Sequence, residues 1–90
     1  MPDFNKIPEH MQETARRYIE RGYRGGDFFN ALVSNDLMGA VGKADDENRD
    51  AIWKWCSFLY NEAPSSCFGS PEIVAAWIDR GGIMGREAVA

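Results

Sequence analysis

The sequence predicts an all-α protein, a compact bundle of four to five short helices in a single domain. Apolar residues recur at helical spacing, cap and stop signals separate the segments, and no pair of strand patterns flanks a hairpin turn. With 90 residues, of which 44% are hydrophobic and 12% aromatic, the chain is long enough for one core. We expect the domain to span residues 7–82, between a flexible N-terminus (1–6) and a flexible tail (83–90).

The first helix is predicted to start around Pro8, because proline suits a first helical turn, and to end at Gly22. Its expected inner stripe, with spacings of i, i+4, i+7 and i+8, is Met11, Ala15, Tyr18 and Ile19. Gly25 and Gly26 then interrupt the helical pattern.

The segment from Phe28 to Ala44 predicts either two consecutive short helices or one bent helix. Asp27 is the expected N-cap of the first part, and Ser34-Asn35-Asp36 provides a second cap signal in the middle.

The longest helix is predicted to begin at the run Asp45-Asp46-Glu47-Asn48, because acidic groups are favourable at a helix N-terminus, and to stop at Pro64. We expect its inner stripe to be Ile52, Trp55, Cys56 and Leu59.

The last helix has three agreeing start signals in Ser70-Pro71-Glu72, and Gly81-Gly82 marks its end. Its expected buried face is Ile73, Val74, Trp77 and Ile78.

The net charge of −4 is concentrated in residues 25–50, where two basic residues stand against six acidic ones. An acidic middle repels phosphate backbones, so the charge disfavours general nucleic-acid binding. No apolar run approaches the roughly 20 residues of a membrane helix, and the N-terminus lacks a signal-peptide pattern. We therefore expect a cytoplasmic protein with no membrane partner.

Most site chemistry is disfavoured by the residue pattern, and we expect no catalytic residue, no cofactor and no metal site. Zinc needs more closely spaced donors than His10, Cys56 and Cys67 provide. The run from Asp45 resembles a calcium loop only superficially, because Asp50 stands where glycine is required. No phosphate-binding glycine motif is present in the sequence.

Both cysteines are expected to be free thiols, Cys56 in the core and Cys67 more exposed in a serine-rich loop. One enzymatic hypothesis remains open, in which Cys67 is a nucleophile and His10 its base.

The aromatic residues outside the strict helical stripes, together with the acidic run, are typical of a protein-binding patch. The alternative for each aromatic residue is core packing. The candidate partner-binding residues are Asp36, Asp45, Asp46, Glu47, Asp50, Trp53, Tyr60 and Phe68.

A basic cluster near the end of the first helix is the candidate for nucleic-acid contact. It consists of Arg16, Arg17, Arg21 and Arg24. The alternative is a solvated helix face, because Glu13 and Glu20 lie at pairing distances of four residues from Arg17 and Arg16.

Several short segments carry a resemblance to a known group of proteins. They are Ile7-Pro8-Glu9-His10-Met11, Arg17-Tyr18-Ile19-Glu20, Ser34-Asn35-Asp36-Leu37, Ala44-Asp45, residues 58–64 and Gly69-Ser70-Pro71-Glu72. Over residues 7–82 the chain resembles a family of small uncharacterised proteins of bacteriophages, prophages and mobile elements. The resemblance implies a bacterial host cytoplasm as the setting and carries no activity.

Three functions are therefore compared. The first is a non-enzymatic accessory protein that binds a host or phage protein. An inhibitor of a host defence protein, such as a CRISPR complex, is one example of this class. The second is a nucleic-acid-associated module that uses the arginine cluster, and the third is the small cysteine enzyme. We favour the first, and we expect a homodimer because so short a chain with eleven aromatic residues leaves apolar surface to cover.

Overall fold

The computed structural model describes the backbone of residues 2–89 and the side chains of residues 2–85, and all regular structure in this part of the chain is helical. The predicted all-α fold is confirmed. The described α-helices are α1 (Gln12–Arg21), α2 (Asp27–Val33), α3 (Leu37–Lys43), α4 (Asp46–Asp50), α5 (Ile52–Asn61), α6 (Pro71–Arg80) and α7 (Gly82–Val89). Short 3₁₀ turns occur at Phe4–Lys6, Glu9–Met11 and Ser65–Cys67.

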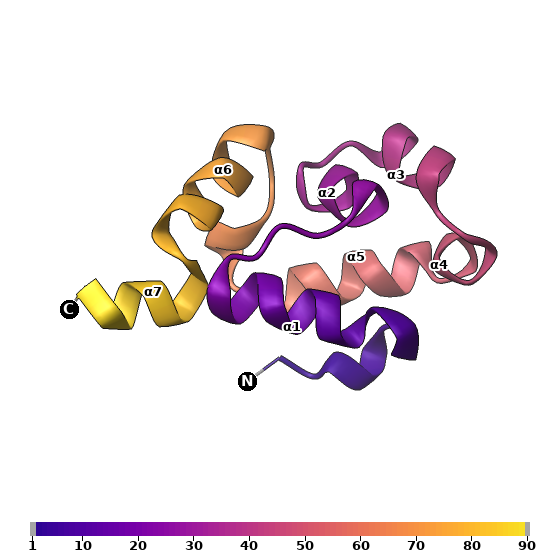
Figure 1. Ribbon diagram of the computed structural model, residues 1–90. Helices are drawn as coiled ribbons and strands as arrows, with labels where there is room; N and C mark the ends of the chain where they lie inside the picture. Colours follow the sequence, from indigo (N-terminus) through magenta and orange to yellow (C-terminus); the bar gives the residue numbers. More distant parts are fainter. Residues whose placement is uncertain (1, 90) are drawn as a thin grey trace.

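Two helices set the length of the molecule and the others are grouped around them. In Figure 1, α1 and α5 run along the long direction, α2 and α3 stand together over one half, and α6 stands over the other half. The last helix, α7, packs against α1 and α6.

The predicted first helix is present, and its inner stripe is buried at Ala15, Tyr18 and Ile19. Gly22 ends the helix in the left-handed conformation with φ of 70°. The preceding segment, predicted to be flexible, contains the Phe4–Lys6 turn, and the Phe4 ring is buried with its centroid 5.6 Å from that of Phe58. The Phe4 side chain therefore anchors this turn against the core.

The segment from residue 28 to residue 44 forms two helices rather than one bent helix. The chain reverses at Asn35, which has a positive φ of 65°, and the Asp36 carboxylate then caps α3 by accepting a bond from the Gly39 amide at 3.0 Å. Asp27 is the first residue of α2 and Gly26 occupies its N-cap, one residue earlier than predicted.

The predicted longest helix is divided at Ala51 into α4 and α5. The division lets Asn48, which is only 3% exposed, turn inward and accept a hydrogen bond from the Trp55 indole at 3.1 Å. The prediction that Cys56 is a core residue is wrong, because Trp55 and Leu59 take the inner face and Cys56 is exposed. One residue along a helix turns a side chain by about 100°, which carries Cys56 out of the stripe.

The last predicted helix is confirmed as α6. Ser70 caps it by accepting a bond from the Ile73 amide at 3.1 Å, Pro71 is its first residue, and Gly81 ends it with φ of 82°. Val74 and Trp77 are buried, whereas Ile73, predicted to face the core, is 38% exposed.

Residues 82–89, which include most of the predicted tail, form the helix α7, and Ala90 lies outside the described residues. Ile83 packs against the core. Gly82 lies against Gly22, so closely that a β-carbon on Gly82 would stand 2.6 Å from the Gly22 nitrogen. This backbone-to-backbone contact joins the end of α1 to the start of α7.

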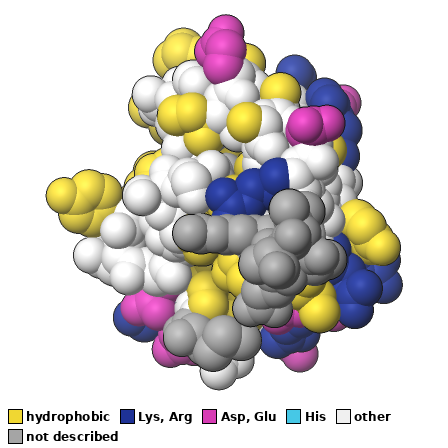
Figure 2. Space-filling model, turned by 90° about the vertical axis from the view of Figure 1, so that its left-hand side faces the viewer, with side chains coloured by type: hydrophobic (Ala, Val, Ile, Leu, Met, Phe, Trp, Pro, Cys, Tyr) yellow, Lys and Arg dark blue, Asp and Glu magenta, His cyan; other side chains and the backbone are white. Residues whose placement is uncertain are grey.

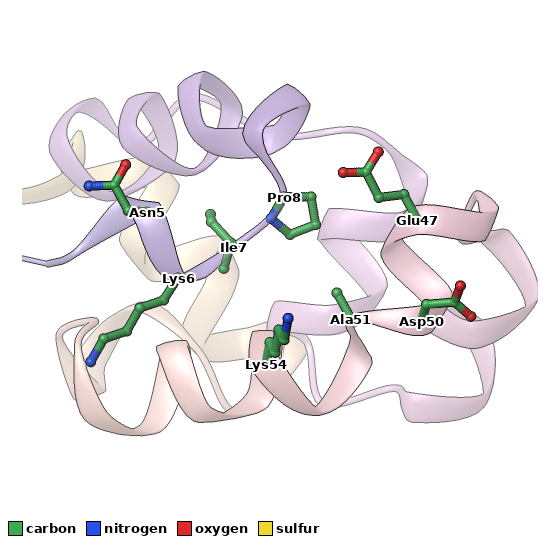
Figure 3. A pocket seen from close by; sticks show the side chains of 8 residues that line it. All are labelled: Asn5, Lys6, Ile7, Pro8, Glu47, Asp50, Ala51 and Lys54. Atoms are coloured by element: carbon green, nitrogen blue, oxygen red, sulfur yellow. The ribbon is translucent and has the colours of Figure 1, made fainter.

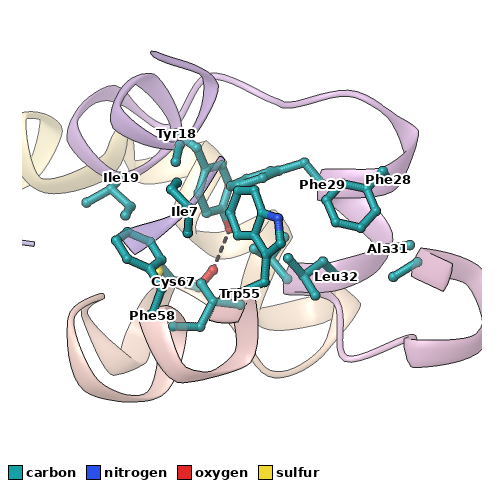
Figure 4. Close-up of a cluster of buried hydrophobic side chains, with 14 of the residues drawn as sticks. Ile7, Tyr18, Ile19, Phe28, Phe29, Ala31, Leu32, Trp55, Phe58 and Cys67 are labelled. Carbon is teal, nitrogen blue, oxygen red and sulfur yellow. Dashed lines mark hydrogen bonds between the residues drawn. The ribbon is translucent and has the colours of Figure 1, made fainter. Parts of the chain in front are cut away.

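The core is built around aromatic rings. Figure 4 shows the Trp55 indole among rings from α1, α2 and α5. Its centroid lies 5.7 Å from Phe28, 5.8 Å from Phe29 and 6.3 Å from Phe58, each in an edge-to-face arrangement. Such pairs contribute beyond the area that they bury.

Two buried hydrogen bonds of Tyr18 join distant parts of the chain. Its hydroxyl donates to the Cys67 carbonyl oxygen at 2.6 Å, the bond dashed in Figure 4. Its own carbonyl oxygen accepts a bond from the Trp77 indole at 2.8 Å. Among the described residues, every buried side-chain nitrogen and oxygen has a hydrogen-bond partner, as a well-packed core requires.

Candidate protein-binding surface

The outward side of α5 carries two large aromatic side chains in solvent. Trp53 is 67% exposed and Tyr60 is 82% exposed. They are seven residues apart, so they lie on the same side of the helix about 10 Å apart along its axis. Cys56 and Ser57 lie between them, and we call these four residues the outer stripe of α5. Large aromatic groups held in water on a rigid helix are typical of interface anchors.

A groove runs beside this stripe, beneath the N-terminal segment. One part, about 300 Å³, is shown in Figure 3 and is lined by Asn5, Lys6, Ile7, Pro8, Glu47, Asp50, Ala51 and Lys54. An adjoining part of about 370 Å³ shares Asn5, Lys6 and Lys54 and extends to Trp53 and Ser57. We call the two parts together the N-terminal groove. It connects the carboxylates of α4 with the exposed indole of α5.

The acidic residues of α4 and its N-cap comprise one structural and three solvent-facing groups. The Asp45 carboxylate caps the helix by accepting a bond from the Asn48 amide at 2.7 Å. Asp46 has a 97% exposed side chain and bonds Arg49, while Glu47 and Asp50 face the N-terminal groove. The acidic part of the candidate surface is therefore Asp46, Glu47 and Asp50.

His10 connects the N-terminal segment to α4. Its Nε2 lies 2.9 Å from an Asp45 oxygen, and its Nδ1 lies 3.5 Å from a Glu47 oxygen. The side chain is 42% exposed. His10 thus holds the N-terminal segment, whose residues line the groove, against the acidic residues at the start of α4.

Three groups at the contacts between the N-terminal segment and α4 or α5 have a shifted pKa. The Asn48 amide, followed by His10, lowers the pKa of Asp45. Lys6 and then the Asp3 amide lower the pKa of Glu62, and the bond to Glu62 raises the pKa of Lys6. The Lys6 Nζ lies 2.9 Å from Glu62. The ionised forms of both carboxyl groups hold residues 3–10 against α4 and α5.

We expect acid to weaken the fold through these two carboxyl groups. A carboxyl group whose pKa is lowered in the folded state stabilises the fold above its unfolded pKa, and this contribution disappears as pH falls through the folded pKa. The midpoint of urea denaturation should therefore decrease between about pH 5 and about pH 3. In the double variant Asp45→Asn, Glu62→Gln this decrease should be smaller, and an unchanged decrease would assign it to other groups.

The arginine cluster is partly neutralised within α1. Glu13 pairs with Arg17 at 3.1 Å and with Arg16 at 3.5 Å, and the Arg16 guanidinium also lies 4.9 Å from the centre of the Phe4 ring. Arg21 and Arg24 are exposed. On the face seen in Figure 2, acidic and basic side chains are interspersed with hydrophobic ones. Two of the four arginines predicted to contact nucleic acid, Arg16 and Arg17, are thus paired with an acidic or aromatic neighbour.

The geometry of Cys67 does not support a nucleophile. The prediction that Cys67 is the more exposed cysteine is wrong, because its side chain is fully buried in the 3₁₀ turn before α6. Burial raises the pKa of the Cys67 thiol to about 12, so the thiol stays protonated at neutral pH. The thiolate that a nucleophile requires is therefore disfavoured at this position.

The two thiols should differ in reactivity, in the order opposite to the one that the sequence suggested. Cys56 is exposed and Cys67 is buried. We expect a maleimide reagent to modify one thiol of the native protein quickly and the second only under denaturing conditions. Peptide mapping should locate the fast modification at Cys56, and equal rates at the two cysteines would contradict the fold around Cys67.

Within the described residues, no group of three or more His, Cys, Asp or Glu side chains is arranged to hold a metal ion. Likewise, none of the helices described is long and apolar enough to cross a membrane.

The structure does not bring all the candidate residues together. Asp36 is the N-cap of α3, a different helix from the acidic residues of α4. Phe68 is half-buried and packs against the core, so it lies outside the exposed aromatic surface. The remaining candidates belong to α4, to its N-cap Asp45 and to α5.

Sequence reasoning also missed part of the surface. Asn5 and Lys6 line the groove because Phe4 anchors their segment, and Lys54 joins the two parts of the groove. Leu37 and Met38, the first two residues of α3, are 56% and 83% exposed. The sequence could have indicated that Lys54 belongs to this surface, because Lys54 follows Trp53 and lies outside the apolar stripe of the helix.

Comparison of the chain with protein-family models, with curated proteins and with solved structures gives no match.

Proposed function

We propose that the protein is a non-enzymatic binding protein that holds a partner protein against α5 and α4. The observation that carries this proposal is the exposure of Trp53 and Tyr60 on one face of a helix whose opposite face is fully packed. Two such side chains in water lack the favourable free energy of burying apolar surface, and a bound partner would supply it by covering them.

The charges around these residues define the kind of partner. Asp46, Glu47 and Asp50 stand in solvent at the start of the same surface, and the chain as a whole carries −4. A surface of this kind complements a partner patch with lysine or arginine residues around an apolar pocket, and its charge would also speed association. A nucleic-acid-binding protein offers such a patch.

The resemblance to proteins of phages and mobile elements supplies the proposed setting. A small acidic protein of such an element would bind a host protein in the bacterial cytoplasm and block its nucleic-acid surface. A defence nuclease or CRISPR complex is the class of target that this chemistry fits.

The test is affinity capture from bacterial lysate, with and without nuclease, using matched variants. We expect one stoichiometric protein to be retained after nuclease treatment. Trp53→Ala should weaken its binding by at least about tenfold, since hot-spot anchors contribute about 2 kcal/mol or more and about 1.4 kcal/mol corresponds to a factor of ten. Asp46→Lys combined with Asp50→Lys should slow association.

Tyr23→Ala is the matched control, because Tyr23 is 55% exposed and lies after α1, away from the acidic residues of α4. Retention that is equal for Trp53→Ala and Tyr23→Ala would contradict the proposed surface. Loss of the captured protein on nuclease treatment would favour the alternative function, in which Arg21 and Arg24 contact nucleic acid directly. That alternative requires binding to DNA or RNA that weakens steeply with salt.

A further inference from the structure

We infer that the outer stripe of α5 binds a second copy of this chain, with the two α5 helices packed antiparallel across a two-fold axis. The argument uses the order, charge and size of the exposed side chains. It does not depend on the proposed partner protein.

The outer stripe reads the same in both directions. Large aromatic residues, Trp53 and Tyr60, stand at its ends, and two small residues, Cys56 and Ser57, stand at its centre. A two-fold interface is self-complementary, so residue i contacts residue j of the partner copy and residue j contacts residue i. With the axis between Cys56 and Ser57, each Trp53 meets the Tyr60 of the other copy.

The small central residues permit the close approach that this pairing needs. Helices pack at 8–10 Å between their axes, depending on the side chains at the crossing. Cysteine and serine at the centre favour the short end of that range, which brings the flanking rings of the two copies into contact. Offset or edge-to-face contacts between such rings add to the area that they bury.

The charge distribution permits two copies of this acidic protein to associate through α5. It also favours antiparallel over parallel packing of the two α5 helices. Lys54 is the only charged residue of Ile52–Asn61, so no acidic residue of α5 itself opposes association. The acidic residues of α4 precede α5. Parallel packing would place the two α4 helices side by side, whereas antiparallel packing carries each of them toward the uncharged residues 63–70 of the other copy.

The size of the stripe makes this association weak. An aromatic side chain offers about 150–250 Å², so four largely exposed rings in a pair bring roughly 600 Å², below the usual range for stable complexes. We therefore expect a dimer that forms in the micromolar to millimolar range. Because the dimer covers Trp53, a second copy and the proposed partner protein would compete.

The first test is sedimentation velocity from about 10 μM to about 1 mM, the range in which so small an interface associates. We expect the native protein to shift from monomer toward dimer. Tyr60→Lys should remain a monomer throughout, because the aromatic contact is lost and each added positive charge comes close to Lys54 of the other copy. Tyr23→Lys, an equally charged change at another exposed tyrosine, should dimerise as the native protein does.

The second test places the two-fold axis. A short bis-maleimide should join two native chains through Cys56, which is exposed and lies next to the axis. The matched variant Cys56→Ser, Ser65→Cys keeps one exposed thiol but moves it off the stripe, and it should cross-link much less. Far-UV circular dichroism verifies that each variant is folded.

Three results would overturn this inference: a native protein that stays monomeric up to about 1 mM, a dimer that survives Tyr60→Lys, or equal cross-linking through residues 56 and 65. Failure of the lysate capture with a persistent dimer would remove only the proposed partner. A captured partner without self-association would remove only the dimer.

Discussion

Replacing Trp77 by alanine is expected to lower the free energy of unfolding by about 3–5 kcal/mol. Trp77 is 1% exposed, its indole N–H donates to the Tyr18 carbonyl oxygen at 2.8 Å, and the Arg80 guanidinium lies 4.5 Å from its ring centre. The substitution leaves a large cavity and removes the indole bond to Tyr18, whose carbonyl oxygen keeps only the bond from the Gly22 amide at 2.9 Å. Domains of this length have roughly 5–14 kcal/mol of stability, so much of it would be lost.

Urea denaturation followed by circular dichroism measures this loss, and Trp53→Ala is the matched control. The same substitution at the exposed Trp53 should change stability by less than about 0.5 kcal/mol. If the two variants had equal midpoints, the buried position of Trp77 would be contradicted.

Gly82→Ala is expected to destabilise the protein by about 2–5 kcal/mol. Gly82 has φ of +69°, and an added β-carbon would stand 2.6 Å from the Gly22 nitrogen and 2.7 Å from the Arg21 nitrogen. Both neighbours are backbone atoms, so the start of α7 would have to move away from the end of α1. Left-handed strain and displaced packing therefore act together.

Gly42→Ala is the contrasting variant. Gly42 lies in α3, and an added β-carbon there would meet nothing within 4 Å. Alanine lowers the entropy of the unfolded chain, so this variant should be more stable by about 0.5–1 kcal/mol. Thermal denaturation of both variants gives the comparison, and a Gly82→Ala protein as stable as Gly42→Ala would rule out the contact between α1 and α7.

The helix boundaries that local chemistry specifies were predictable from the sequence. Ser70 with Pro71 at the start of α6, Asp36 at the start of α3, and Gly22 at the end of α1 all act through their own backbone neighbourhoods. Such signals need no knowledge of the rest of the fold.

Features that depend on distant contacts were not predictable. The division between α4 and α5 is coupled to the Asn48 to Trp55 bond, and the helix after Gly82 is placed by contact with α1. Cys67 was misplaced for the same reason, whereas Cys56 is exposed because it lies one residue beyond the inner stripe of its own helix. Cys67 is buried in a turn whose carbonyl oxygen is held by Tyr18, and no local pattern announces that bond.

The candidate surface was predictable in composition but not in position. Trp53 and Tyr60 were singled out because they lie beside the apolar stripe of their helix, and both are exposed. Phe68 is also aromatic and was singled out with them, but it packs against the core. Only the fold distinguishes an aromatic residue that faces water from one that does not.

The two hydrogen bonds of Tyr18 also have a consequence for synthesis of the protein on the ribosome. They connect α1 to Cys67 and Trp77, which lie 49 and 59 residues later in the chain. The two buried hydrogen bonds of the first helix therefore cannot both form until α6 has been made and has left the exit tunnel. We expect the domain to fold in one late step rather than helix by helix, so nascent chains that end before Trp77 should remain sensitive to protease.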